Sequence, residues 1–113
     1  MSDASAPDDF EAELARLSAD YARDLPARVA ELREAHARGA AGAADLCEGA
    51  HRLRGTAGSY GFAEISALAG RLEDALRPPL DARTEVAATL AAQAGTLADL
   101  EATARRIAAS TTR

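Results

Sequence analysis

Several kinds of residue are scarce or absent in this 113-residue sequence, and each absence excludes a class of protein. The sequence has no lysine, no tryptophan, only 4% aromatic residues and a single cysteine. One cysteine cannot form an internal disulfide, so nothing indicates an oxidising compartment. No apolar run approaches the roughly 18 residues of a membrane span, and the acidic, polar N-terminus does not resemble a signal peptide. We therefore expect a soluble cytoplasmic protein.

The charge of the sequence is also one-sided. All 13 basic side chains are arginines, and 18 acidic residues bring the net charge to −5. An acidic chain without a basic block is a poor nucleic-acid binder, because phosphate neutralisation supplies most of that affinity. We therefore expect neither nucleic acid nor a membrane among its partners.

The residues that are abundant favour helices. Apolar residues make up 48% of the sequence, mostly as alanine and leucine. Alanine is the best helix former and leucine, arginine and glutamate follow it closely. Strand formers are scarce, and no run of alternating apolar and polar residues is present. The sequence predicts a single all-α domain.

The N-terminal part of the chain is predicted to contain a break. Residues 1–7 are small and polar and are predicted to be a disordered N-terminus, with the helical bundle domain spanning 8–110. Pro26 suits the first turn of a helix better than its interior, so Asp24 is interpreted as the cap of a second helix. The segment before it becomes a short additional helix that acts as a lid.

The rest of the chain predicts three longer helices. One helix spans about 43–59, and Gly61 is suited to a left-handed turn before the next, over about 62–76. Pro78-Pro79 is expected to stop that helix, and Asp81 to cap a long last one. Each helix has one apolar stripe and the connections are short. We therefore predict an antiparallel up-down four-helix bundle with an additional short N-terminal helix.

The most informative segment begins at His51. Gly55 and Gly58 lie inside the predicted helix, although a glycine there costs about 0.5–1 kcal/mol relative to alanine. Residues three and four apart are neighbours on a helix, so His51 stands between the cation of Arg54 and the bare backbone of Gly55. This arrangement suits a histidine that another protein must approach closely. The predicted docking surface consists of Cys47, Arg52, Gly55, Gly58 and Ser59; close helix packing is a second explanation of Gly55.

A carboxylate is expected opposite His51. In an antiparallel pair that turns near Gly61, the positions opposite this histidine are Leu72 and Glu73. Leu72 continues the core stripe, so Glu73 falls at its edge and could accept a hydrogen bond from one ring nitrogen, leaving the other as a nucleophile. If the turn is misplaced by one residue, Glu73 becomes a plain surface charge.

Plainer interpretations of His51 remain open. The ring could lie at the edge of the core, satisfied by Glu73, or share a metal ion with Cys47 one turn away. Zinc sites usually need three or four protein ligands, and His36 is the only other histidine, so we expect no metal. We interpret His36 as a cation near a helix C-terminus and Cys47 as a small, partly buried filler.

The segment resembles the histidine-containing phosphotransfer (HPt) family of two-component phosphorelays. That family's pattern is a histidine, then an apolar residue, a lysine or arginine, a glycine, a small residue, a second glycine and a later apolar-Glu pair. These places are filled by His51, Leu53, Arg54, Gly55, Ala57, Gly61 and Leu72-Glu73. The resemblance covers about residues 12–107 in helix layout and is specific over about 47–76; arginine at position 54 replaces the commoner lysine.

The resemblance implies a phosphocarrier without a kinase or ATP-binding domain. His51 would be the phosphoacceptor, Arg54 would stabilise the phosphoryl group, and Glu73 would orient the histidine. The implied partners are receiver domains of response regulators and hybrid histidine kinases in bacterial signalling, which supply Mg²⁺; the chain itself would bind no cofactor and be monomeric.

Two other functions compete with this implication. One is a non-catalytic helical adaptor, a pseudo-HPt binding module. The other is the phosphoacceptor part of a sensor kinase. The histidine of a sensor kinase is typically followed by an acidic residue and soon afterwards by a proline. Here Arg52 follows His51 and no proline comes until Pro78, so this function is disfavoured.

Overall fold

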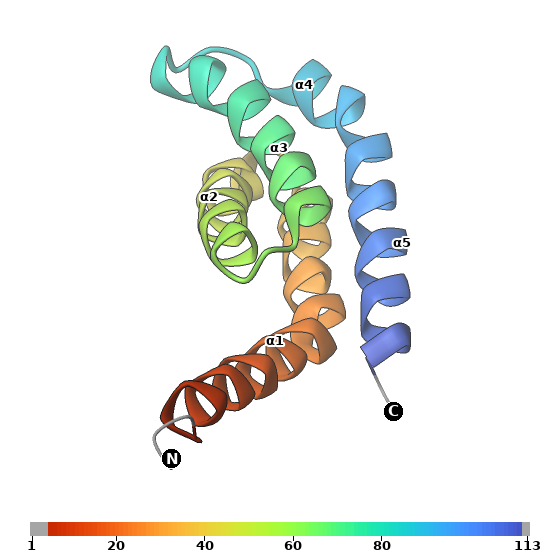
Figure 1. Cartoon of the computed structure of the whole chain (residues 1–113). Coiled ribbons are helices and arrows are strands. Elements are labelled where there is room, and N and C mark those ends of the chain that lie inside the picture. Colours follow the sequence, from red (N-terminus) through yellow and green to blue (C-terminus); the bar gives the residue numbers. More distant parts are fainter. Residues whose placement is uncertain (1–4, 112–113) are drawn as a thin grey trace.

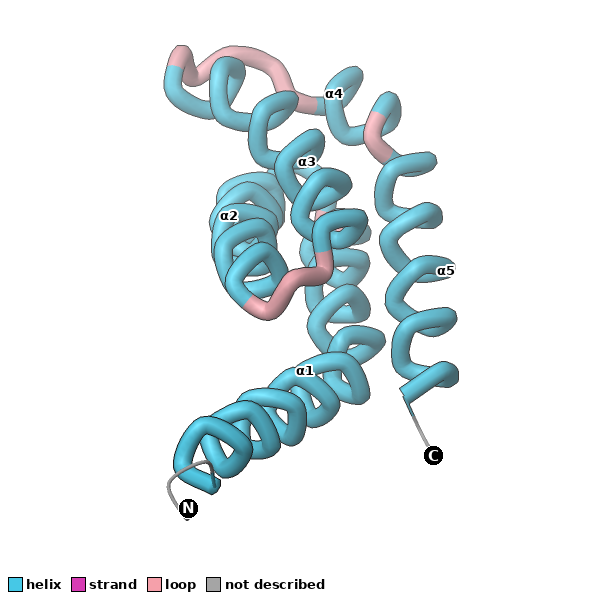
Figure 2. The backbone as a smooth tube through the Cα atoms, in the orientation of Figure 1, coloured by secondary structure: helices cyan, strands magenta, loops and turns pink. Residues whose placement is uncertain are grey.

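The computed structural model of the chain describes residues 5–111. Over these residues the chain forms helices and no strand, which confirms the all-α prediction (Figures 1 and 2). No helix in this range is long and apolar enough to cross a membrane. The elements in chain order are α1 (Ser5–Ala37), the 3₁₀ helix η2 (Gly39–Gly42), α2 (Ala43–Ser59), α3 (Ala63–Asp81), α4 (Ala87–Ala92) and α5 (Ala94–Thr111).

Four of the helices enclose one core. Both α2 and α5 pack against α1 and α3, so the second half of α1, α2, α3 and α5 form the predicted bundle (Figure 1). Burying a leucine, isoleucine or valine side chain contributes about 1.5–3 kcal/mol, so these helices are held mainly by their apolar stripes. The largest fully buried side chains are Leu25, Val29, Leu46, Ile65, Leu72, Leu76, Leu97 and Leu100.

The start of the chain differs from the prediction. Instead of a short lid followed by a second helix, α1 is one continuous helix with Pro26 inside it. Its course bends in Figure 1, which we attribute to the missing N–H and the steric clash of this proline. Leu25 and Val29 are fully buried and hold the helix on either side of Pro26. Of the segment predicted to be disordered, residues 1–4 lie outside the described range, and residues 5–7 belong to α1.

The turn between α2 and α3 is as predicted. Gly61 has a φ of +86°, a left-handed conformation that glycine adopts without the Cβ clash of other residues. The amide of Phe62 donates to the carbonyl of Ala57 at 2.8 Å, and the amide of Gly61 donates to that of Gly58 at 3.1 Å. These bonds end α2 and turn the chain back within three residues.

The C-terminal part of α3 departs from the prediction. Pro78 and Pro79 do not stop the helix, which continues to Asp81. Their carbonyls still accept hydrogen bonds, from the amides of Ala82 at 3.0 Å and Thr84 at 2.9 Å, so the last turn closes without the two missing donors. The chain leaves this turn at Arg83, whose φ is +57°.

The predicted single last helix is two helices, α4 and α5, separated at Gln93. His36 lies in the last turn of α1, as predicted, and its Nε2 is 2.8 Å from the carbonyl oxygen of Leu90 in α4. A carbonyl only accepts hydrogen bonds, so Nε2 carries the hydrogen. This bond ties the end of α1 to α4 beside the break.

Candidate functional site

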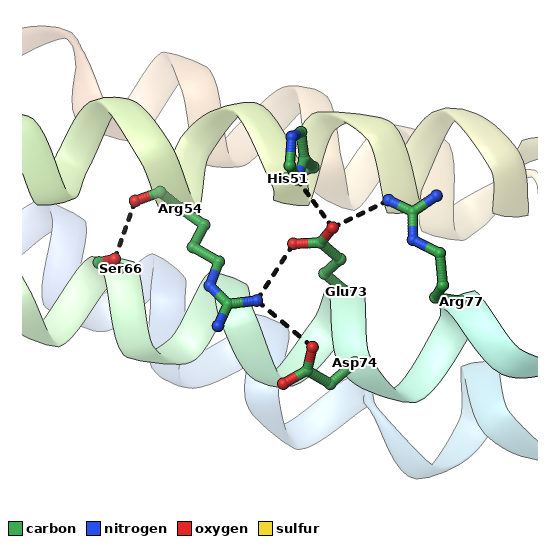
Figure 3. Close-up of polar contacts among 6 residues, drawn as sticks. All are labelled: His51, Arg54, Ser66, Glu73, Asp74 and Arg77. Carbon is green, nitrogen blue, oxygen red and sulfur yellow. Dashed lines mark hydrogen bonds and ion pairs between the residues drawn. The ribbon is translucent and has the colours of Figure 1, made fainter.

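His51 and Glu73 face each other across the seam between α2 and α3 (Figure 3). The Nδ1 atom of His51 is 2.8 Å from Oε2 of Glu73, so the opposition expected from the helix hairpin is present. The His51 side chain is 65% exposed, whereas that of Glu73 is only 10% exposed. An ionised carboxylate only accepts hydrogen bonds, so Nδ1 carries the hydrogen, and in the neutral form of the ring Nε2 keeps a lone pair.

The charge on Glu73 is maintained by its neighbours. Hydrogen bonding from Arg77 is the largest influence and lowers the pKa of the Glu73 carboxyl. Burial opposes this effect, and hydrogen bonds from His51 and Arg54 reinforce it. Glu73 is therefore ionised at neutral pH and is a strong acceptor for the histidine ring.

Arg77 is part of the cluster, although the sequence interpretation did not single it out. Its Nη2 lies 2.8 Å from Oε2 of Glu73, the same oxygen that bonds His51 (Figure 3). Residues four apart on a helix are neighbours, so the Glu73–Arg77 spacing was a signal that could have found it. Nearly half of the Arg77 side chain is exposed beside the histidine.

Arg54 approaches Glu73 from the other side. Its Nη1 lies 3.3 Å from Oε1 of Glu73 and 3.3 Å from Oδ1 of Asp74. The guanidinium lies over Gly70, where an added Cβ would be 3.1 Å from Nε of Arg54. Ser66 donates its hydroxyl hydrogen to the carbonyl of Arg54 at 2.8 Å, which fixes α3 against α2 at this point. The cluster thus pairs two arginines with two carboxylates beside one histidine.

The surface around His51 is bare where the sequence predicted it. A Cβ at Gly55 would meet no atom within 4 Å, so close helix packing does not explain this glycine. Gly58 is also exposed, but a Cβ there would be 3.3 Å from Oγ of Ser66, so α3 does restrict that position. Arg52 and Ser59 are exposed, as a docking surface requires.

Cys47 does not belong to the predicted docking surface. It is 2% exposed and forms part of the core. Burial raises the pKa of its thiol, so it stays protonated at neutral pH and is a poor nucleophile. The side chain only borders a hollow of about 300 Å³ beside His51 and Arg77. Within residues 5–111, no three His, Cys, Asp or Glu side chains are grouped so that they could hold a metal ion.

Comparison with known proteins adds one finding to this geometry. A family model described as the Hpt domain matches residues 16–109. No curated protein and no solved structure gives a significant match to the chain. The matched range contains the whole of α2 and α3, and therefore every residue of the cluster around His51.

Proposed function

Because the chain belongs to the Hpt domain family, whose general function is histidine phosphotransfer in phosphorelays, we propose that His51 is its phosphoacceptor. The observation that carries this proposal is the division of labour between the two ring nitrogens. Nδ1 is bonded to the buried carboxylate of Glu73, which leaves Nε2 on a ring that is largely exposed. In His36, the other histidine, Nε2 is already hydrogen-bonded to the backbone carbonyl of Leu90.

The proposed step is nucleophilic attack by Nε2 on the phosphorus of an aspartyl phosphate in a receiver domain. The P–N bond forms while the bond from phosphorus to the aspartyl oxygen breaks, and the aspartate leaves as a carboxylate. The ring becomes positively charged, Nδ1 keeps its hydrogen, and the negative Glu73 beside it stabilises that charge. The reverse step passes the phosphoryl group to the aspartate of another receiver domain.

The two arginines are suited to different tasks in this step. A phosphoryl group brings nearly two negative charges at neutral pH, and a guanidinium can bind two of its oxygens. Arg54 is half-exposed and held by Glu73 and Asp74 at 3.3 Å, so it is free to exchange Asp74 for a phosphoryl oxygen. Arg77 makes the shorter contact to Glu73 and keeps the carboxylate in place.

The partner must supply the remaining chemistry. Phosphoryl transfer depends on in-line approach and on neutralisation of charge, and the receiver domain brings Mg²⁺ for the second requirement. The open surface at Gly55 leaves room for that approach, with Arg52, Gly58 and Ser59 around it. We propose that this chain is a cytoplasmic, monomeric carrier without kinase activity, which docks receiver domains of response regulators and hybrid histidine kinases.

Transfer from a radiolabelled, phosphorylated receiver domain to the purified chain tests the proposal. We expect acid-labile label on the wild type and on His36→Gln, and none on His51→Gln. Equal labelling of His51→Gln and the wild type would contradict the assignment. If none of the three is labelled by a receiver that labels another Hpt domain, the chain is a non-catalytic adaptor.

A further inference from the structure

The first half of α1 projects beyond the bundle (Figure 1). It also carries apolar side chains that no other element covers. Phe10 is 68% exposed, Leu14 is 48% exposed and Leu17 is 43% exposed. They are the exposed large apolar side chains within the described part of the chain. We call these three residues the α1 stripe. Single exposed apolar residues are normal on protein surfaces, but a row on one projecting helix indicates a binding surface.

The spacing of the α1 stripe is that of a helix-pairing seam. Steps of four and three residues separate its members, and a further step of four leads to Tyr21. In a heptad, these residues occupy the d, a, d and a positions. Tyr21 is buried and stacks on Tyr60, with ring centroids 4.7 Å apart, and on Phe62. The seam therefore starts in solvent and ends against the turn between α2 and α3.

The charges beside the seam identify the kind of partner. In the same register, Glu11 lies at an e position, and Glu13 and Asp20 lie at g positions. Glu13 and Asp20 also form ion pairs with Arg16 and Arg23 of the same helix, and because these pairs are exposed they are weak enough to be exchanged for a partner's cations. The charged residues over 9–20 are four acids and one arginine, which gives a net charge of −3. A second copy of α1 would place acidic flanks against acidic flanks, and an anionic membrane would be repelled.

We propose that the α1 stripe binds an amphipathic helix of a partner protein, whose apolar seam is flanked by lysine or arginine. Apolar side chains of the partner helix pack between Phe10, Leu14 and Leu17. Its lysine or arginine side chains pair with the acidic residues at the e and g positions of α1. The stripe shares no residue with the cluster around His51. A partner protein bound to the α1 stripe stays close to His51 without covering it. The effective concentration of that partner near the histidine is therefore raised.

Two designed peptides test the chemistry of this surface on the full chain. Both are helices of three heptads with leucine at a and d; one has lysine at all e and g positions, and the other has glutamate. We expect the basic peptide to bind saturably in fluorescence anisotropy and the acidic peptide to bind at least tenfold more weakly. The affinity of the basic peptide should fall as salt is raised, because exposed charges are screened.

Matched variants locate the binding surface. Leu14→Gln with Leu17→Gln should weaken binding of the basic peptide at least tenfold. Ala12→Gln with Ala15→Gln changes two exposed residues on the same segment but outside the seam, so its affinity should stay within twofold of wild type. Circular dichroism checks that both double variants remain helical.

Several outcomes would overturn the proposal. They are no binding of the basic peptide, equal binding of both peptides, and unchanged binding by the Leu14→Gln, Leu17→Gln variant. Sedimentation that shows a dimer of the chain, lost in this variant, would make the stripe a self-interface instead. Failure of phosphotransfer is a separate result, since His51→Gln should bind the basic peptide as the wild type does.

Discussion

The surroundings of the two histidines differ in the group that holds each ring. His51 stands in the middle of α2, mostly exposed, with Nδ1 bonded to a buried carboxylate. His36 lies half-buried at the end of α1, with Nε2 bonded to the neutral carbonyl of Leu90. A carboxylate orients the ring and also stabilises positive charge on it, whereas a carbonyl mainly orients it. The hydrogen-bond partner of the ring and its exposure, rather than the residue type, distinguish the proposed phosphoacceptor from a histidine that joins two helices.

Removing the charge of Glu73 should make the surroundings of His51 resemble those of His36. Glu73→Gln keeps the size of the side chain, and we expect the phosphotransfer rate to fall about 10- to 100-fold, by analogy with the groups that orient metal-ligating histidines. Rapid-quench transfer from a phosphorylated receiver measures the rate. A rate within twofold of wild type would show that the carboxylate charge does not matter.

The same variant has a second readout in the pH dependence of stability. The pKa of Glu73 in the folded chain lies below its ordinary value of 4.5, so its contribution to stability is complete above that pH. The contribution is lost as the pH falls through the lowered value. Urea unfolding between pH 6 and 3 should therefore show a smaller loss of stability for Glu73→Gln than for the wild type.

Filling the bare surface beside His51 should separate docking from folding. Gly55→Gln adds a side chain where no atom lies within 4 Å, so we expect helix stability to rise by about 0.5 kcal/mol and phosphotransfer to slow about tenfold. Gly95→Gln is the matched control, because Gly95 is also exposed in a helix with open space around it. Equal transfer rates in the two variants would contradict a docking role for Gly55.

Removing the tie at His36 should affect stability alone. His36→Leu loses the hydrogen bond to Leu90, and we expect the free energy of unfolding to fall by about 1 kcal/mol. Urea denaturation measures this change, and the phosphotransfer rate should equal that of the wild type. A slower transfer rate in a fully folded variant would show that His36 is more than a structural tie.

The smallest expected effect concerns the carboxylate that competes for Arg54. Asp74→Asn removes one of the two acceptors of the Arg54 guanidinium, which then binds a phosphoryl group on His51 more readily. We expect the equilibrium fraction of phosphorylated chain, measured against one receiver domain, to rise about two- to threefold, the scale of an exposed ion pair. Asp99→Asn makes the same charge change on α5 and should leave this fraction unchanged.

Local patterns were enough to predict the hairpin that carries the site. The bounds of α2 match the prediction, because an apolar stripe and Gly61 mark its length and its end. Once the turn was placed, antiparallel geometry put Leu72 or Glu73 opposite His51, and the core stripe assigned Leu72 to the interior, which left Glu73. Both inferences depend on residues close to the turn, where small errors in register do not accumulate.

The errors came from features that tertiary packing decides. Pro26 and Pro78-Pro79 were interpreted as helix boundaries, but buried neighbours and the bonds to the proline carbonyls keep both helices continuous. The bond between His36 and Leu90 joins residues 54 apart, beside a break at Gln93 that no proline marks and that precedes Gly95 by two residues. No local pattern could predict such a contact.

The short turn at residues 60–62 also restricts how the length of the chain can vary. Each residue of an α-helix rotates the chain by about 100°, so one residue inserted or deleted there would turn α3 against α2 by that angle. His51 would then lose Glu73, and the buried leucines of α3 would rotate out of the core. The exposed connection over 82–85 imposes no such register on the site. We therefore expect related sequences to keep a constant length between His51 and Glu73, and to vary in length between α3 and α4.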